Sequence, residues 1–204
     1  MKKNIITVLL ALLGIAFGAG AQMRWAPVVG INGNNLVFKQ DLVSVSPTIG
    51  YQAGVMGEMI FPGIGIGIDI GLLYNQAGAE VDLGQKLVWS SDGYGKERVY
   101  LHNLNIPVHL RFKYTRLNGL EDKIAPIIYG GPEFNIQVAH GKCKAFKYSG
   151  GDFGLTVAGG AELFKRWQLT GGYTWGMTYV LKTKKLDNFS ARSRQWFVRC
   201  AYFF

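Results

Sequence analysis

The sequence contains little charge, no apolar run long enough for a bilayer-spanning helix, and only two cysteines. Asp, Glu, Lys and Arg make up 17% of its 204 residues, against about 25% in an average soluble domain. The longest apolar run, Ile5 to Ala19, lies at the extreme N-terminus and falls short of the roughly 20 residues that a membrane-spanning helix needs. These absences disfavour a polytopic helical membrane protein.

Apolar and aromatic residues are plentiful instead. Apolar residues make up 49% of the chain, which also has 28 glycines, 12 phenylalanines, 10 tyrosines and 5 tryptophans. So much apolar surface excludes a disordered chain, and the length allows one domain or two small ones.

The N-terminal segment has the pattern of a secretory signal peptide. Lys2 and Lys3 precede the apolar run, and Ala19-Gly20-Ala21 fits a small-x-small cleavage site before Gln22. We therefore expect residues 1–21 to be removed and residues 22–204 to form one exported domain. Loss of the two lysines would leave 20 basic and 13 acidic residues, a charge of +7.

The exported part alternates between apolar and polar residues with the period of a β-strand. The clearest case is Trp167 to Tyr179, where Trp, Leu, Tyr and Met alternate with Gln, Thr and Gly over thirteen residues. A soluble strand averages about five or six residues. A tilted strand that crosses a bilayer needs about nine to eleven.

The same pattern, clear or weaker, predicts eight strands. They are expected at residues 24–34, 47–61, 64–76, 100–114, 125–139, 153–164, 167–179 and 196–204. Short connections are expected at residues 61–63, 115–124 and 165–166, and long ones at 35–46, 79–97, 140–152 and 181–193. Short turns at one end and long loops at the other are typical of an outer-membrane barrel.

The predicted fold is therefore all-β: an eight-stranded antiparallel transmembrane β-barrel with up-and-down meander topology. A soluble lipocalin-like barrel is the competing interpretation, with its apolar face inside. Strand length, the signal peptide and the terminal Phe204 favour the membrane barrel. Pro107 falls in the middle of a predicted strand, where it cannot donate a ladder hydrogen bond, so a bulge or kink is expected there.

Three segments resemble the PorT-type outer-membrane β-barrel family. They are YLHNLNIPV at residues 100–108, PIIYGGP at residues 126–132, and Gly30-Ile31-Asn32 near the start of the exported chain. The resemblance implies a small eight-stranded barrel, of the kind also seen in OmpX and OmpA, in a Gram-negative outer membrane. Asn105 departs from the family pattern, which usually has Glu there. Most members have no assigned activity, so the resemblance supports fold and location, and the secretion and gliding role of one branch is not transferred.

Eight ionisable residues fall on the predicted inward faces. They are Glu58, Asp69, His109, Arg111, Lys113, Glu133, Glu162 and Arg199. An eight-stranded barrel is barely wide enough for its own side chains, and isolated buried charges are costly. We interpret these residues as a polar network that pairs and plugs the interior; a narrow pore or proton path is the alternative.

No metal site, cofactor or catalytic site is expected. The three histidines, His102, His109 and His140, show no HxH or HExxH spacing. A lipid-modifying enzyme would place His and Ser near the outer rim, where His102 and Ser90 or Ser91 are candidates. Cys143 and Cys200 are predicted to lie too far apart for a disulfide, with Cys200 facing lipid.

Two predicted extracellular loops are basic. Their cations are Lys142, Lys144, Lys147, Lys182, Lys184, Lys185, Arg192 and Arg194. Solvated loop charge is one interpretation, and contact with lipopolysaccharide phosphates is the other. Nucleic acid is not expected as a partner of an exported protein.

The aromatic C-terminus, with Tyr202 and Phe204, resembles the signal read by the barrel assembly machinery. The sequence thus predicts a monomeric, non-enzymatic outer-membrane barrel that contacts outer-membrane lipids and has a structural or surface-interaction role. The alternatives are an outer-leaflet lipid-modifying enzyme and a narrow channel.

Overall fold

The computed structural model describes residues 22–39, 43–61, 65–82, 96–114, 119–141, 146–183 and 190–204. The predicted signal peptide, residues 1–21, lies outside this part of the chain. Among the described residues, no helix is long and apolar enough to cross a membrane.

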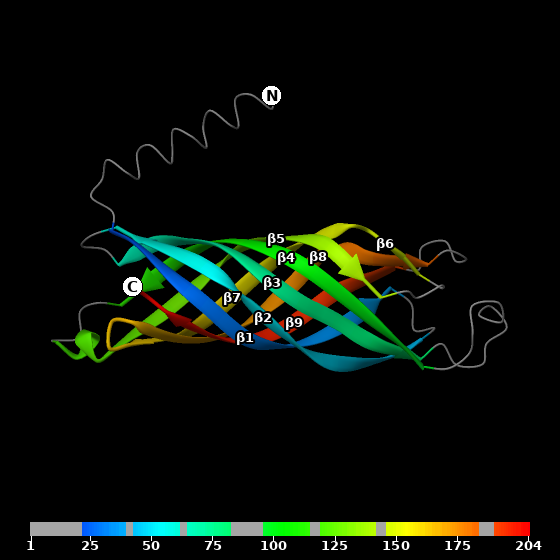
Figure 1. The fold of residues 1–204 in the computed structure, drawn as a ribbon, viewed down its shortest axis with the longest axis horizontal. Helices are drawn as coiled ribbons and strands as arrows, with labels where there is room; N and C mark the ends of the chain where they lie inside the picture. Colours follow the sequence, from blue (N-terminus) through cyan, green and yellow to red (C-terminus); the bar gives the residue numbers. More distant parts are fainter. Residues whose placement is uncertain are drawn as a thin grey trace, which may run out of the picture.

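The strands form a closed ring. They are β1 (Gln22–Phe38), β2 (Ser44–Ile60), β3 (Ile66–Asp82), β4 (Lys96–Lys113), β5 (Ile124–His140), β6 (Phe146–Tyr148), β7 (Gly151–Leu163), β8 (Trp167–Thr183) and β9 (Ser190–Tyr202), with a short 3-10 helix η2 (Leu120–Asp122) before β5. Each long strand pairs antiparallel with the long strand before it, and β9 pairs with both β8 and β1, which closes the barrel (Figure 1). The three-residue β6 pairs with β8 at the end opposite the C-terminus. The prediction of an eight-stranded antiparallel meander barrel is confirmed.

Apolar side chains cover the outside of the central wall. They include Val29, Ile31, Ile49, Val55, Ile68, Ile70, Leu72, Leu110, Ile128, Val157, Leu169 and Val198. The positions between them on each strand face inward and are largely polar. A soluble barrel would have the opposite arrangement, so the lipocalin-like alternative is wrong.

Two tryptophans pack against glycines on this outer surface. Gly33 of β1 is in register with Trp196 of β9, and a Cβ at Gly33 would lie 2.1 Å from the Trp196 indole. Trp25 covers Gly57 in the same way near the other end of the barrel, where an added Cβ would approach the ring to 2.9 Å. Amphipathic rings at both levels are typical of the interfacial girdles of membrane barrels.

The polarity of the two faces reverses at the end of the barrel opposite the C-terminus. There an apolar cluster, which we call the apolar cap, lies inside the barrel. Its buried members are Leu36, Ala77, Ala79, Val81, Val99, Leu101, Phe146, Val180, Leu181 and Ala191. Outward residues at this level, such as Glu80, Arg98 and Lys182, are polar. The barrel therefore continues past the membrane as a water-facing extension.

Strand length agrees with this extension. A strand of 17 residues, such as β1 or β8, spans about 56 Å at roughly 3.3 Å per residue. A tilt of about 45° converts this length to a height of roughly 40 Å, whereas the apolar band of an outer-membrane barrel is about 25 Å tall. About 15 Å of each long strand pair thus lies outside the apolar band.

The predicted extents of the long connections are wrong where the structure describes them. The strands continue into the ranges 35–46, 79–97, 140–152 and 181–193. Apolar and polar residues still alternate there, but the apolar residues now face inward. Between β6 and β7 the chain bends at Gly150, whose φ of 78° suits glycine. The Ser149 N–H still donates to the carbonyl oxygen of Val180 at 3.1 Å, which keeps this bend on the wall.

Pro107 is accommodated by a gap in the ladder. Pairing of β4 with β3 stops at Val108 and resumes at Asn105 in the same register. The proline is buried on the inner face, and its Cγ would lie 3.4 Å from a Cβ placed on Gly71 of β3. Of the two expected accommodations, the bulge is wrong, because the register of β4 does not shift at Pro107, and the kink stays a prediction. The register shift of β4 against β5 falls at His102–Asn103.

Two adjacent glycines of β8 should respond differently to an added methyl group. A Cβ on the inward Gly172 would lie 2.5 Å from the Ala158 Cβ and 2.7 Å from the Phe197 ring. A Cβ on the outward Gly171 meets only the Phe197 carbonyl oxygen, at 3.7 Å. We expect G172A to cost about 1–3 kcal/mol of unfolding free energy through overpacking. G171A should unfold near the wild-type urea midpoint, and equal midpoints for the two variants would contradict this packing.

Candidate functional site: the charged interior and the basic rim

Glu58 of β2 is the centre of an ion-pair network in the half of the barrel nearer the C-terminus. Its two oxygens lie 2.5 Å from an Arg24 nitrogen and 2.9 Å from an Arg111 nitrogen. The Gln168 side-chain amide donates to it at 2.7 Å. Arg111 also donates to both oxygens of Asp69 at 2.6–2.8 Å. One carboxylate thus links β1, β2, β4 and β8 across the lumen.

Glu162 of β7 provides a second link across the same layer. It accepts from Arg24 at 2.6 Å and is ion-paired with Lys113. The Gln168 amide also approaches it, at 3.3 Å. Both carboxylates are 1% exposed, so these are buried charges whose partners offset a large desolvation cost.

A third polar group lies at the middle of the barrel around Glu133 of β5. Asn105 donates to Glu133 at 2.7 Å, and the Thr156 hydroxyl donates to it at 3.1 Å. Arg199 lies 3.6 Å from the same carboxylate and donates through Nε to the Gln52 side-chain oxygen at 2.8 Å. Asn105 of β4 therefore binds a buried carboxylate of the neighbouring strand β5.

An amide layer lies between Glu133 and the apolar cap. Asn32 donates to the Asn75 side-chain oxygen at 2.6 Å, and Asn34 donates to Asn32 at 2.6 Å. Asn75 in turn donates to Gln195 at 3.0 Å. These four buried side chains connect β1, β3 and β9 without any net charge.

The three histidines contact three different tyrosines. His109 is buried inside and stacks on Tyr129, with ring centres 5.1 Å apart. His102 faces outward, and its Nδ1 lies 2.6 Å from the Tyr74 hydroxyl. His140 stacks on Tyr148 near the end of β5. No group of three or more His, Cys, Asp or Glu side chains in the described ranges could hold a metal ion.

All eight ionisable residues assigned to the interior face inward. Seven are at most 2% exposed, and the Lys113 side chain is 12% exposed. Sequence reasoning missed Arg24. It lies two residues before the inward Ala26, and residues two apart on a strand share a face, so the alternation could have identified it as inward. Sequence reasoning also missed the amide layer, because uncharged amides are not distinctive until the inward face is known.

The structure describes four of the eight predicted rim cations: Lys147, Lys182, Arg192 and Arg194. The other four, Lys142, Lys144, Lys184 and Lys185, lie outside the described residues, as do Ser90, Ser91 and Cys143. All four described cations lie in strands rather than in loops, because β6, β8 and β9 continue into the extension.

Two of these cations are combined with aromatic rings on the outer face. The Arg192 guanidinium lies 4.9 Å from the centre of the Tyr179 ring. Arg194 is in register with Trp175 of β8 and lies two residues from the outward Trp196. The basic rim therefore begins at the level of the outer aromatic girdle.

The last strand ends in aromatic rings that pack edge to face. Tyr202 contacts Trp167 and Phe204, with ring centres 4.8 Å and 5.4 Å apart. The Phe204 N–H donates to the carbonyl oxygen of Trp25 at 3.2 Å, although the side chain is 83% exposed. Cys200 is a free thiol on the outward-facing positions of β9.

Residues 19–182 match the family model of the outer membrane protein beta-barrel domain. The chain belongs to this family of outer-membrane β-barrels. No curated protein matches the sequence. Membership in this family indicates that the barrel lies in the outer membrane. The narrower resemblance to PorT-type barrels stays a prediction.

The solved structure of OprG shows the same fold. OprG from Pseudomonas aeruginosa is 10% identical, with a TM-score of 0.53 over 89% of this chain and 94% of that one. Ail of Yersinia pestis, solved with the heparin analogue sucrose octasulfate, has a TM-score of 0.45 at 9% identity, over 90% and 99% of the two chains. Neisserial surface protein A has a TM-score of 0.44 at 12% identity, over 87% and 97%.

Removing one buried partner of the network should destabilise the barrel strongly. R111M leaves Asp69 without its guanidinium and Glu58 with Arg24 alone, and loss of one member of a buried ion pair typically costs about 3–5 kcal/mol. R98M makes the same change at the exposed Arg98, 3.7 Å from Glu80, and should change stability little. Urea unfolding followed by the heat-modifiable gel shift measures both, and equal midpoints would refute a stabilising interior network.

Proposed function

We propose that this protein is a sealed outer-membrane barrel with a structural or surface-interaction role. The observation that supports the proposal is that side chains from opposite walls contact one another across the lumen at successive levels. Ion pairs cross the lumen around Glu58 and Glu162, the amide layer lies above them, and the apolar cap lies inside the extension. An eight-stranded barrel has just enough room for its own side chains, so these contacts favour a plug over a pore.

Bilayer conductance tests the plug. Purified barrel inserted into a planar lipid bilayer should give no reproducible unit conductance, because ions would have to displace paired charges and then cross an apolar cap. An open porin inserted by the same protocol serves as the positive control. A unit conductance that scales with salt concentration would instead support the narrow-channel alternative.

An outer-leaflet lipid-modifying enzyme is the second candidate. His102, its proposed base, faces outward and is hydrogen-bonded to Tyr74. That bond engages Nδ1 with a phenol, whereas a nucleophilic mechanism needs a base within reach of a serine or similar group. Lipid A from a deletion strain and its parent should therefore have identical mass spectra, and a missing acyl or phosphate modification in the deletion strain would favour the enzyme.

We propose, further, that the basic rim binds lipopolysaccharide phosphates. Arg192 and Arg194 lie on the outer face beside Tyr179 and Trp175, at the level where lipid headgroups meet the aromatic girdle. A guanidinium can bind a phosphate through two parallel hydrogen bonds.

We propose two other partners for the barrel, which we take to be a monomer. One is the lipid of the outer membrane, and the other is the barrel assembly machinery, which would contact Tyr202 and Phe204.

Paired double variants test the rim. Lipopolysaccharide should raise the thermal unfolding midpoint of the wild type in detergent, and R192A/R194A should lose most of this rise. K165A/R166A removes the same charge from the exposed turn at the opposite end and should keep it. If lipopolysaccharide raised the midpoint of both variants equally, the rim cations would be ordinary solvated charges and the proposal would be wrong.

A further inference from the structure

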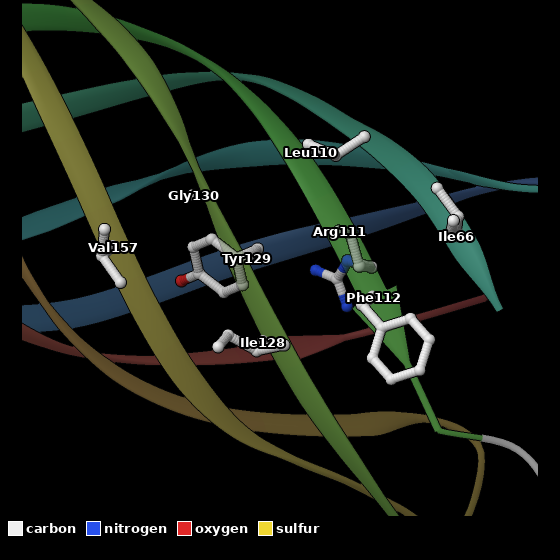
Figure 2. A pocket seen from close by; sticks show the side chains of 8 residues that line it. All are labelled: Ile66, Leu110, Arg111, Phe112, Ile128, Tyr129, Gly130 and Val157. Atoms are coloured by element: carbon white, nitrogen blue, oxygen red, sulfur yellow. The ribbon is translucent and has the colours of Figure 1, made fainter.

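A groove of about 340 Å³ indents the lipid-facing wall across β3, β4, β5 and β7 (Figure 2). The side chains that line it are Ile66, Leu110, Arg111, Phe112, Ile128, Tyr129 and Val157, together with the backbone of Gly130. Arg111 and Tyr129 are only 1% and 3% exposed and belong to the interior, so the walls that face outward are apolar.

The groove follows from one missing side chain. Gly130 of β5 is in register with Leu110 of β4 on one side and with Val157 of β7 on the other. Leu110 is 64% exposed and Val157 is 47% exposed, so both project beyond the glycine. The result is a notch, one strand wide, between two apolar side chains.

The depth of the notch places it in hydrocarbon. Tyr114, an outward ring that is 43% exposed, follows the end of β4 on the periplasmic side, near the chain terminus. Leu110 is four residues along the strand, a distance of about 13 Å, or about 9 Å of depth at a tilt of roughly 45°. Since the apolar band is about 25 Å tall, the groove lies within the periplasmic leaflet.

We infer that this groove holds one acyl chain of a periplasmic-leaflet phospholipid. Its surroundings are hydrocarbon, its walls are apolar, and the exposed Lys123 directly precedes β5 at the headgroup level, where it can approach a phosphate. A second copy of the chain is too large an occupant, because eight residues line the groove and a stable interface takes about 20–30 residues from each side.

Native mass spectrometry tests the inference. The barrel is reconstituted in nanodiscs of phosphatidylethanolamine and phosphatidylglycerol and released by stepwise activation, and the wild type should keep one phospholipid after the others are lost. G130L fills the notch and should lower this retention about tenfold, the effect of losing roughly two methylene contacts.

G171L is the matched control, because Gly171 also faces lipid and an added Cβ there makes only one ordinary van der Waals contact, 3.7 Å from the Phe197 carbonyl oxygen. It should keep the phospholipid. L110A removes one wall without crowding the backbone, so it should weaken retention even if G130L fails to assemble. Equal retention by wild type, L110A and G171L would overturn the inference. Chemical cross-links that form between two wild-type chains and are lost in L110A would also overturn it, because a second copy of the chain would then cover the groove.

Discussion

The need to pair every backbone N–H and C=O group in hydrocarbon determines this structure. Strands cannot leave an open edge in lipid, so β9 must return to β1 and close the ring. Closure with eight long strands makes the lumen narrow, and it divides each strand into one face for lipid and one for the interior. The apolar lipid face and the crowded inward face both follow from that closure.

The narrow lumen explains the arrangement of the charges. Glu58 and Glu162 each accept from more than one cationic or amide donor, and Arg24 contacts both. A buried carboxylate with a single partner would leave lone pairs unsatisfied in a low dielectric. Shared partners satisfy more of these groups in less space, and they tie opposite walls of the barrel together.

The reversal of polarity separates the membrane part from the extension. Where the outside is lipid, the inside can be polar, because lipid supplies the apolar environment for the outward side chains. Where the outside is water, the inside must supply the apolar core, and the apolar cap does so with Phe146, Leu101 and Leu181. The basic rim begins at this boundary, which is also where Arg192 and Arg194 meet the aromatic girdle.

The sequence by itself determined the strands, their antiparallel order and the inward positions of Glu58, Asp69 and Arg111, because alternation with period two is a local property of the chain. It also indicated the outer membrane through strand length. It could not determine how far the strands extend. In the extension the outward face becomes polar, and a polar outward face following an apolar one looks like the start of a loop. Nor could the sequence show that Arg24 bridges Glu58 and Glu162, or that Gly130 opens a groove. Those features depend on the register between strands distant in sequence, and only ring closure decides that register.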